Sequence, residues 1–250
     1  SILLMKKIIP SFLTILNLIC GCMAIALAFQ FQFEAVLILV CIGNFFDFLD
    51  GLSARALNVV TNFGKHLDSI TDVITSGVVP GVVVYQLFKL SGNKVSDFEM
   101  LIFGYDLMFS LSPISFIAFI ITIGSAIRLS RFNTAIKFDD FIGLPTPANA
   151  IFFSALPVLI NSEFLIESKG IFLNNYFLII SVLFSVFLMN SQFRLFSLKI
   201  SLNDFKSNIY QFTLILISIP VLFYFNLGGL VIIILIYLLL NIVRNLWTIF

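Results

Sequence analysis

Charged side chains are scarce in this chain of 250 residues, because Asp, Glu, Lys and Arg together make up 11% of the sequence. Soluble globular domains carry roughly a quarter of their residues as these four types. The formal net charge is +1, so the clustered basic excess that is typical of nucleic-acid-binding proteins is missing as well. With 60% hydrophobic residues, the sequence predicts an integral membrane protein that has no nucleic-acid partner.

Cysteine is also rare. The three cysteines, Cys20, Cys22 and Cys41, lie in apolar runs and are odd in number. Neither a disulfide framework nor a zinc site is supported by such a set. We expect these residues to act as small buried hydrophobic side chains.

Long apolar runs, in contrast, recur along the whole chain. A helix needs about 20 apolar residues to cross the roughly 30 Å of hydrocarbon in a bilayer. Candidate spans lie at residues 10–31, 35–52, 67–90, 100–128, 146–161, 173–192, 209–225 and 228–246. Because proline disfavours helix in the residue before it, Pro145 and Pro147 predict a non-helical turn over 143–147. The sequence therefore predicts an all-α integral membrane protein with about eight transmembrane helices, forming a single membrane domain over residues 1–250.

The basic residues predict how this domain is oriented. Cytoplasmic loops of membrane proteins carry an excess of Lys and Arg. With the N-terminus inside, only Lys89, Lys94 and Lys169 of the 14 basic residues lie outside, which leaves 11 on the cytoplasmic side. We expect both termini and the segment 54–65 to be cytoplasmic, in the cell membrane.

Four aspartates stand together in this apolar background. Asp47 and Asp50 are three residues apart, and Asp68 and Asp72 are four apart, so on helices each pair shares one face. Charged residues in membrane helices are costly and usually functional. Two opposed acidic faces would repel each other without a cation, and oxygen ligands suit Mg²⁺ or Mn²⁺. The spacing therefore predicts a divalent metal site made by these four carboxylates.

The residues between the two pairs suit phosphate binding. Gly51 has no side chain beside Asp50, which allows close backbone approach, and Arg55 offers a planar guanidinium for a phosphate. Gly64 stands one turn before Asp68 and can open the facing helix in the same way. The alternative is an ordinary charged cytoplasmic loop, but loop charges have no reason to keep helical spacing with glycines on the same faces.

These residues match a known signature at every fixed position. The pattern is Asp47-x2-Asp50-Gly51-x2-Ala54-Arg55-x8-Gly64-x3-Asp68-x3-Asp72. It resembles the signature of the CDP-alcohol phosphotransferase family. The resemblance implies a membrane enzyme that moves a phosphatidyl or similar group from a CDP-linked donor to an alcohol and releases CMP.

The resemblance also implies roles for single residues. Asp47, Asp50 and Asp68 correspond to ligands of divalent metal, expected as two Mg²⁺ or Mn²⁺ ions. Asp72 corresponds to the general base that takes the proton of the acceptor hydroxyl, and it also contacts metal. The residues expected to line the CDP-diacylglycerol site are Gly51, Ala54, Arg55, Gly64 and Asn17. For Asn17 a contact between helices is almost as good an explanation.

Further segments, at 76–80, 128–133, 143–148 and 188–191, resemble the bacterial and archaeal membrane-spanning subgroup whose acceptor is L-serine. The resemblance covers about residues 8–200, which form the expected catalytic core, and leaves about 205–250 as extra helices. It implies CDP-diacylglycerol and L-serine as substrates, a lipid environment and a homodimer. Glycerol 3-phosphate or an inositol phosphate remains open as acceptor. From the carboxylates alone, an intramembrane metal or proton transporter also remains open.

Two arginines three residues apart, Arg128 and Arg131, stand at the cytoplasmic end of one predicted span. A guanidinium matches either the carboxylate of serine or a phosphate of the donor. Interfacial anchoring is the alternative for both residues.

Overall fold

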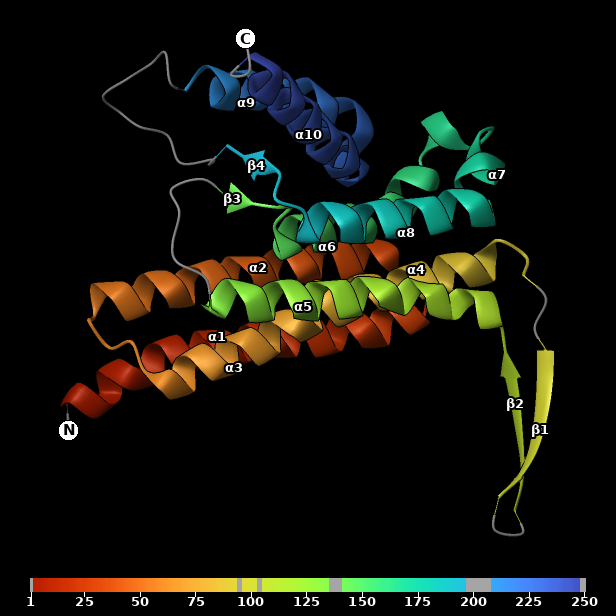
Figure 1. Cartoon of the computed structure of the whole chain (residues 1–250), viewed down its shortest axis with the longest axis horizontal. Helices are drawn as coiled ribbons and strands as arrows, with labels where there is room; N and C mark the ends of the chain where they lie inside the picture. The colour runs from red at the N-terminus through yellow and green to blue at the C-terminus, as the bar shows by residue number, and fades with distance from the viewer. Residues whose placement is uncertain (1, 94–95, 103–104, 135–140, 197–207, 248–250) are drawn as a thin grey trace.

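The structure is a computed structural model that describes residues 2–93, 96–102, 105–134, 141–196 and 208–247. The α-helices are α1 (Ile2–Phe29), α2 (Phe33–Ala56), α3 (Asn62–Val73), α4 (Val79–Leu90), α5 (Ile120–Thr134), α6 (Thr146–Ile160), α7 (Lys169–Phe172), α8 (Asn175–Asn190), α9 (Ile209–Phe225) and α10 (Gly229–Trp247). The strands are β1 (Ser96–Ile102), β2 (Tyr105–Leu111), β3 (Phe141–Ile142) and β4 (Arg194–Leu195). Shorter helical turns are η1 (Ile74–Val78), η2 (Pro113–Phe119), η3 (Glu163–Leu165) and η4 (Asn226–Gly228). Helices dominate the fold (Figure 1), so the all-α prediction is confirmed.

The central helix of the bundle is the continuous run from α3 through η1 to α4. In its most apolar stretch 72% of the residues are buried, against 28–33% in the other long helices. η1 is a π-helical turn, which Pro80 explains, because proline cannot donate to the carbonyl four residues earlier. That carbonyl, of Ser76, accepts instead from Ser125 Oγ of α5 at 3.4 Å. Thr122 Oγ1 donates to Gly77 O at 2.9 Å, so α5 forms two hydrogen bonds with the π-helical turn.

Within the part of the chain that the structure describes, five helical runs are long and apolar enough to cross a membrane, as expected of a membrane protein. They are Ile8–Phe29, Phe33–Ala56, Asn62–Leu90, Pro113–Arg131 and Ile209–Asn245. α6 and α8 are apolar but shorter, and Ile209–Asn245 contains both α9 and α10. The predicted count of eight spans therefore stays a prediction.

The predicted span 100–128 is wrong in its first part. β1 (Ser96–Ile102) pairs antiparallel with β2 (Tyr105–Leu111), and the two strands project from one end of the bundle (Figure 1). Asp97 and Glu99 alternate with apolar residues, a period of two that belongs to a strand. The membrane helix begins only at Pro113, where proline opens η2.

The predicted turn over 143–147 is also partly wrong, because α6 begins at Thr146 and holds Pro147 in its first turn. The first helical positions have no intrahelical partner for an N–H, so proline is tolerated there. The non-helical part is confirmed at Gly143, whose φ of +70° favours glycine. A Cβ at this position would lie 2.4 Å from the carbonyl oxygen of Met189.

One part of the apolar core lies where α1, α2, α4 and α6 meet, and a larger part lies among α4, α5, α6 and α8. Small side chains let α1 approach closely, and Ala24 and Ala28 are fully buried against Val36 and Val40 of α2. The C-terminal part of α2 carries Asp47 and Asp50, and α3 carries Asp68 and Asp72.

Candidate metal centre and the surrounding site

Three of the four aspartates come together from two helices. One carboxylate oxygen from each of Asp47, Asp50 and Asp68 lies within 4.8 Å of the other two. α2 supplies the first pair and α3 the third residue, as the helical spacing predicts. Asp72 lies one turn further along α3, within electrostatic reach of all three. The arrangement is therefore a close group of three carboxylates with a fourth beside it.

A residue of α1 orients one of these carboxylates. Thr14 Oγ1 donates to Asp50 Oδ2 at 2.5 Å, and both residues are buried, with 3% and 6% of their surface exposed. The sequence pattern did not point to Thr14. Its one signal is that Thr14 stands three residues before Asn17 and so shares its face of a largely apolar helix.

The group fits a divalent cation. Asp68 Oδ1 is buried and has no hydrogen-bond partner among the described residues. A buried carboxylate oxygen without a partner is costly unless a cation or donor compensates it. Hard divalent cations such as Mg²⁺ and Mn²⁺ prefer ligand sets made of oxygen, which these carboxylates provide.

The space beside Asp50 is open. A Cβ at Gly51 would meet nothing closer than Arg55 Nη2, at 3.8 Å. Arg55 Nε donates to Gly51 O at 2.9 Å, which folds the exposed guanidinium back along α2 toward this opening. Ala54 lies half-buried on the same final turns of α2. Gly51, Ala54 and Arg55 thus lie on the last turns of α2, just after Asp50, and their predicted contact with the donor stays a prediction.

Gly64 has a different local setting. Its N–H donates to Thr61 Oγ1 at 3.0 Å, and this bond caps the N-terminus of α3. A Cβ at Gly64 would lie 3.1 Å from the same oxygen. Gly64 therefore takes part in the N-terminal cap of α3. Its predicted contact with CDP-diacylglycerol stays a prediction.

A buried polar patch lies behind the acidic group. Asn17 is fully buried, and neither polar atom of its side chain has a hydrogen-bond partner among the described residues. Gly43 of α2 makes room for it, because a Cβ there would lie 2.8 Å from Asn17 Oδ1. Thr71 and Ser76 are also fully buried with unpartnered hydroxyls within the described part of the chain. Sequence reasoning found Asn17 but missed both hydroxyls, which depend on how the helices pack.

Arg128 makes a junction between three segments. Its Nε donates to Met189 O of α8 at 3.2 Å, and its Nη2 donates to Ile142 O and Gly143 O at 3.3 and 3.4 Å. The structure thus gives Arg128 backbone partners that sequence reasoning did not consider. Arg131 lies exposed one turn later on α5.

The last helix supports this junction. Asn241 Oδ1 accepts from Phe196 N at 2.7 Å, and Tyr237 hydroxyl donates to Phe196 O at 3.0 Å. Phe196 follows β4, which pairs with β3 immediately before Gly143. α10 is therefore linked through β4 and β3 to the loop that Arg128 holds.

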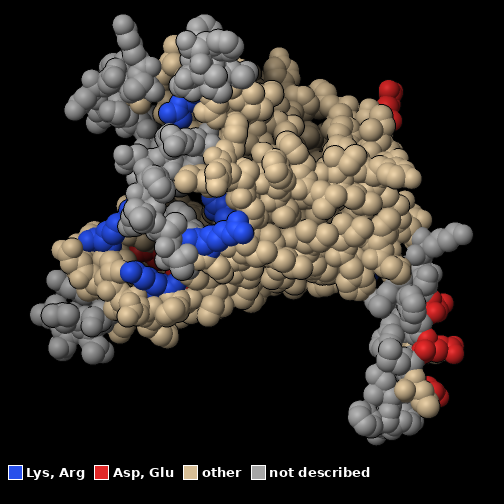
Figure 2. Space-filling model, viewed as in Figure 1, with Lys and Arg blue, Asp and Glu red and all other residues tan. Residues whose placement is uncertain are grey.

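The charges around the acidic group are complementary to it. Figure 2 shows Lys and Arg side chains around a hollow at the left end of the view, with acidic atoms visible inside it. This is the end of the bundle where α2 ends and α3 begins (Figure 1). An anionic substrate approaching the carboxylates there would pass basic side chains.

The chain is similar in sequence to several proteins that carry the name of one enzyme. The chain is 33% identical over 141 residues to the CDP-diacylglycerol–serine O-phosphatidyltransferase of Bacillus subtilis, covering 56% of this chain and 69% of the relative. The protein of the same name from Methanocaldococcus jannaschii is 32% identical over 160 residues, or 64% of this chain and 65% of that one. For the Helicobacter pylori protein of that name, identity is 31% over 209 residues, 82% of this chain and 77% of the relative.

A family model described as CDP-alcohol phosphatidyltransferase matches residues 7–187. The match contains the whole acidic group, the polar patch behind it and Arg128, and it ends within α8. From this match and from the three clustered carboxylates, we conclude that the chain belongs to the CDP-alcohol phosphatidyltransferase family.

Proposed function

We propose that this protein transfers the phosphatidyl group of CDP-diacylglycerol to the hydroxyl of L-serine and releases CMP. The observation that carries the proposal is the group Asp47, Asp50 and Asp68 in a chain that belongs to this family. The choice of serine is supported by the names of the relatives.

The carboxylate group supports a metal-dependent transfer. Asp47, Asp50 and Asp68, with Asp72 beside them, would hold two Mg²⁺ or Mn²⁺ ions. Bound there, the metal supplies positive charge that stabilises the oxygens of the pyrophosphate. Thr14 donates to Asp50, which supports a role in orienting this carboxylate. The bond from Arg55 Nε to Gly51 O, beside Asp50, supports the proposal that the guanidinium binds a donor phosphate.

Asp72 is the proposed base. In the transfer, the serine oxygen bonds to the phosphorus that carries diacylglycerol, and the bond from that phosphorus to the CMP oxygen breaks. CMP leaves with the electron pair, and Asp72 takes the hydroxyl proton. The position of Asp72 outside the group of three supports a role distinct from theirs.

The remaining predicted residues receive weaker support. Gly51 and Ala54 border the opening beside Asp50, whereas Gly64 caps α3. The side-chain polar atoms of Asn17 have no partner within the described ranges, which supports a contact with the donor or with water. Because Arg128 donates to three carbonyls, we propose that it positions the site. The exposed position of Arg131 one turn later supports the proposal that it meets the serine carboxylate or a donor phosphate.

We further propose that the site opens to the cytoplasm of the cell membrane, that both termini lie there, and that the acyl chains of the donor stay in lipid. The distribution of Lys and Arg supports this orientation. Homodimer formation and the division into a core at about 8–200 and extra helices at about 205–250 are carried only by the family resemblance.

A panel of acceptors tests the function. Membranes containing the protein are incubated with CDP-diacylglycerol, Mg²⁺ or Mn²⁺, and L-serine, glycerol 3-phosphate or an inositol phosphate, and CMP is measured. We expect CMP release with L-serine. Release with a phosphorylated acceptor instead would replace the serine assignment, and metal flux without any CMP would favour a transporter.

A further inference from the structure

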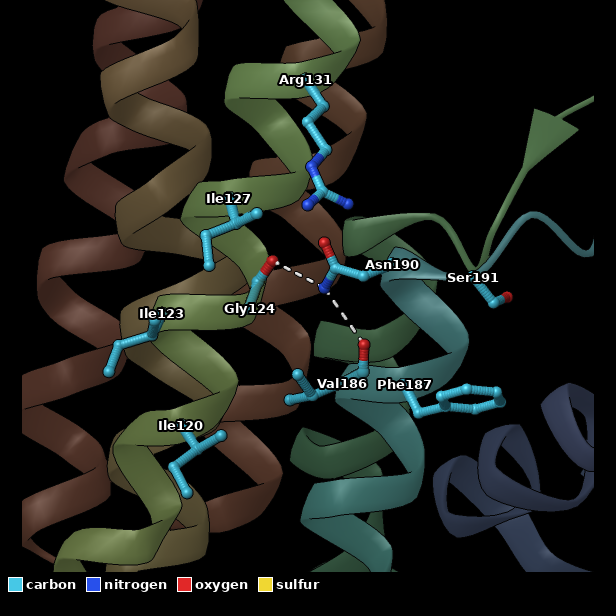
Figure 3. A pocket seen from close by; sticks show the side chains of 9 residues that line it. All are labelled: Ile120, Ile123, Gly124, Ile127, Arg131, Val186, Phe187, Asn190 and Ser191. Atoms are coloured by element: carbon cyan, nitrogen blue, oxygen red, sulfur yellow. Dashed lines mark hydrogen bonds between the residues drawn. The ribbon is translucent and has the colours of Figure 1, made fainter.

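The two strands β1 and β2 stand apart from the helical bundle. β1 follows the candidate span Asn62–Leu90 and β2 precedes the next one, Pro113–Arg131, so both strands are attached at the same membrane surface. They lie at the end of the bundle opposite to the acidic group, and they run across the direction of α4 and α5 (Figure 1). A hairpin in this position extends along the membrane surface. The groove between α5 and α8 in Figure 3, in contrast, lies along the spans.

The strands reach well beyond the helices that they join. Each strand has seven residues, which gives about 23 Å at roughly 3.3 Å per residue. A helix with its side chains is about 10–12 Å wide, so this length corresponds to about two helix diameters. A two-stranded hairpin is marginally stable in water unless another surface packs against it. One face of the hairpin therefore needs a covering surface.

The register of the strands separates charged from uncharged residues. Successive residues of a strand belong to opposite faces of the ladder. On one face each of three cross-strand pairs contains a carboxylate, and these pairs are Asp97 with Ser110, Glu99 with Met108, and Asp106 with Leu101. The pairs that alternate with them contain no charged residue, and they are Phe98 with Phe109, Met100 with Leu107, and Ile102 with Tyr105. We call these two sets of positions the acidic face and the uncharged face.

The acidic face is turned toward water. Asp97, Glu99 and Asp106 are exposed, and Figure 2 shows acidic side chains along the side of the hairpin that is turned away from the bundle. Neither described strand contains Lys or Arg that could neutralise them. Removing a carboxylate from water is costly without a paired cation, and the phosphates of lipid headgroups would repel it. The uncharged face is then the one on the side of the membrane.

We propose that the hairpin of β1 and β2 lies flat on the membrane surface, with its uncharged face against lipid and its acidic face toward water. The partner is the headgroup region of a bilayer, in which an amphipathic element buries its apolar side down to the upper acyl chains. Tyrosine is enriched at that level, and Tyr105 belongs to the uncharged face. Lipid is favoured over a second copy of the chain, because the hairpin is attached to the ends of two candidate spans and lipid surrounds such spans without any association.

Spin labels on the two faces test the proposal with the full chain in phosphatidylcholine bilayers. Met100 and Met108 form a matched pair, because both are methionines inside a strand and they belong to opposite faces. Met100→Cys and Met108→Cys are made in a background in which Cys20, Cys22 and Cys41 are Ala, and collisions of the nitroxide with O₂ and with a water-soluble nickel chelate are measured. O₂ dissolves in lipid, so the ratio of O₂ to nickel collisions should be higher at position 100 than at position 108. Equal ratios at the two positions would overturn the proposal.

Dilution with unlabelled protein separates lipid from a second copy. If the uncharged faces of two chains met, labels at position 100 would lie close together and broaden each other's spectrum. We expect the spectrum of the Met100→Cys protein to be the same with and without an excess of unlabelled protein added before reconstitution. Broadening that disappears on dilution would assign the uncharged face to a second copy and overturn the proposal.

A photoreactive lipid keeps the test independent of these substitutions. Phosphatidylcholine with a photoreactive group close to the glycerol is mixed into bilayers that hold the unaltered protein, and the residues labelled on irradiation are identified by mass spectrometry. Labels should appear in β1 and β2 as well as at the ends of the spans. Labelled spans together with unlabelled strands would overturn the proposal. None of these measurements uses turnover, so they stand apart from the test of the proposed function.

Discussion

Replacing Thr14 by Val removes one hydroxyl from the metal centre and leaves all four carboxylates in place. Thr14 Oγ1 lies 2.5 Å from Asp50 Oδ2, and only 3% of Thr14 is exposed, so water cannot readily replace the lost donor. A hydrogen bond to a charged group contributes about 1.5–3 kcal/mol. Since about 1.4 kcal/mol is a factor of ten, the metal concentration needed for half-maximal activity should rise about 10- to 150-fold. Losses of this order are usual when a group that orients a metal ligand is removed.

The assay is CMP release from CDP-diacylglycerol and L-serine over a titration of Mg²⁺ or Mn²⁺. Thr14→Ser is the matched control, because it keeps the hydroxyl and loses only a methyl group. We expect this control to follow the unaltered protein closely. A Thr14→Val protein with an unchanged metal dependence would refute the role of Thr14 in holding Asp50.

Three further predictions concern the base, the metal and the last helix. Asp72→Asn should abolish CMP release while binding of CDP-diacylglycerol persists, and normal turnover would remove Asp72 as the base. EDTA should abolish activity, and added Mg²⁺ or Mn²⁺ but not Ca²⁺ at the same concentration should restore it, because Ca²⁺ needs a larger and more flexible ligand set. Asn241→Leu leaves the buried N–H of Phe196 without its partner, so it should lower the free energy of unfolding by about 1–3 kcal/mol. A thermal or denaturant melt against the unaltered protein checks this, and equal stability of the two would argue against the link between α10 and β4.

The acidic group was predictable because it depends on local spacing. Once 47–50 and 68–72 are helical, each pair must share a face, and a metal-sized group follows if the two helices lie side by side. The contact of Thr14 with Asp50 was not predictable, since it depends on the packing of α1 against α2 across 36 residues of sequence. The same holds for Arg128, whose partners Ile142 and Met189 lie 14 and 61 residues further along the chain.

The errors in the fold have physical reasons as well. A count of apolar residues does not distinguish a strand with a period of two from a membrane helix. For this reason the predicted span 100–128 was wrong at the β1–β2 hairpin. The turn predicted up to Pro147 ends earlier, because proline in the first turn of α6 loses no hydrogen bond. α6 and α8 are helices as predicted. At 15 and 16 residues they are shorter than the roughly 20 residues that a transmembrane helix needs.

The most direct test of the central claim is the stoichiometry of the transfer by the purified full chain. L-serine labelled with ¹⁴C and CDP-diacylglycerol are incubated with Mg²⁺ or Mn²⁺, and the label in the lipid extract is compared with the CMP formed. We predict one labelled phosphatidylserine for each CMP, and neither product from a variant with Asp47 and Asp68 both changed to Asn. CMP formed without label in lipid, or label transferred equally by the double variant, would contradict the account.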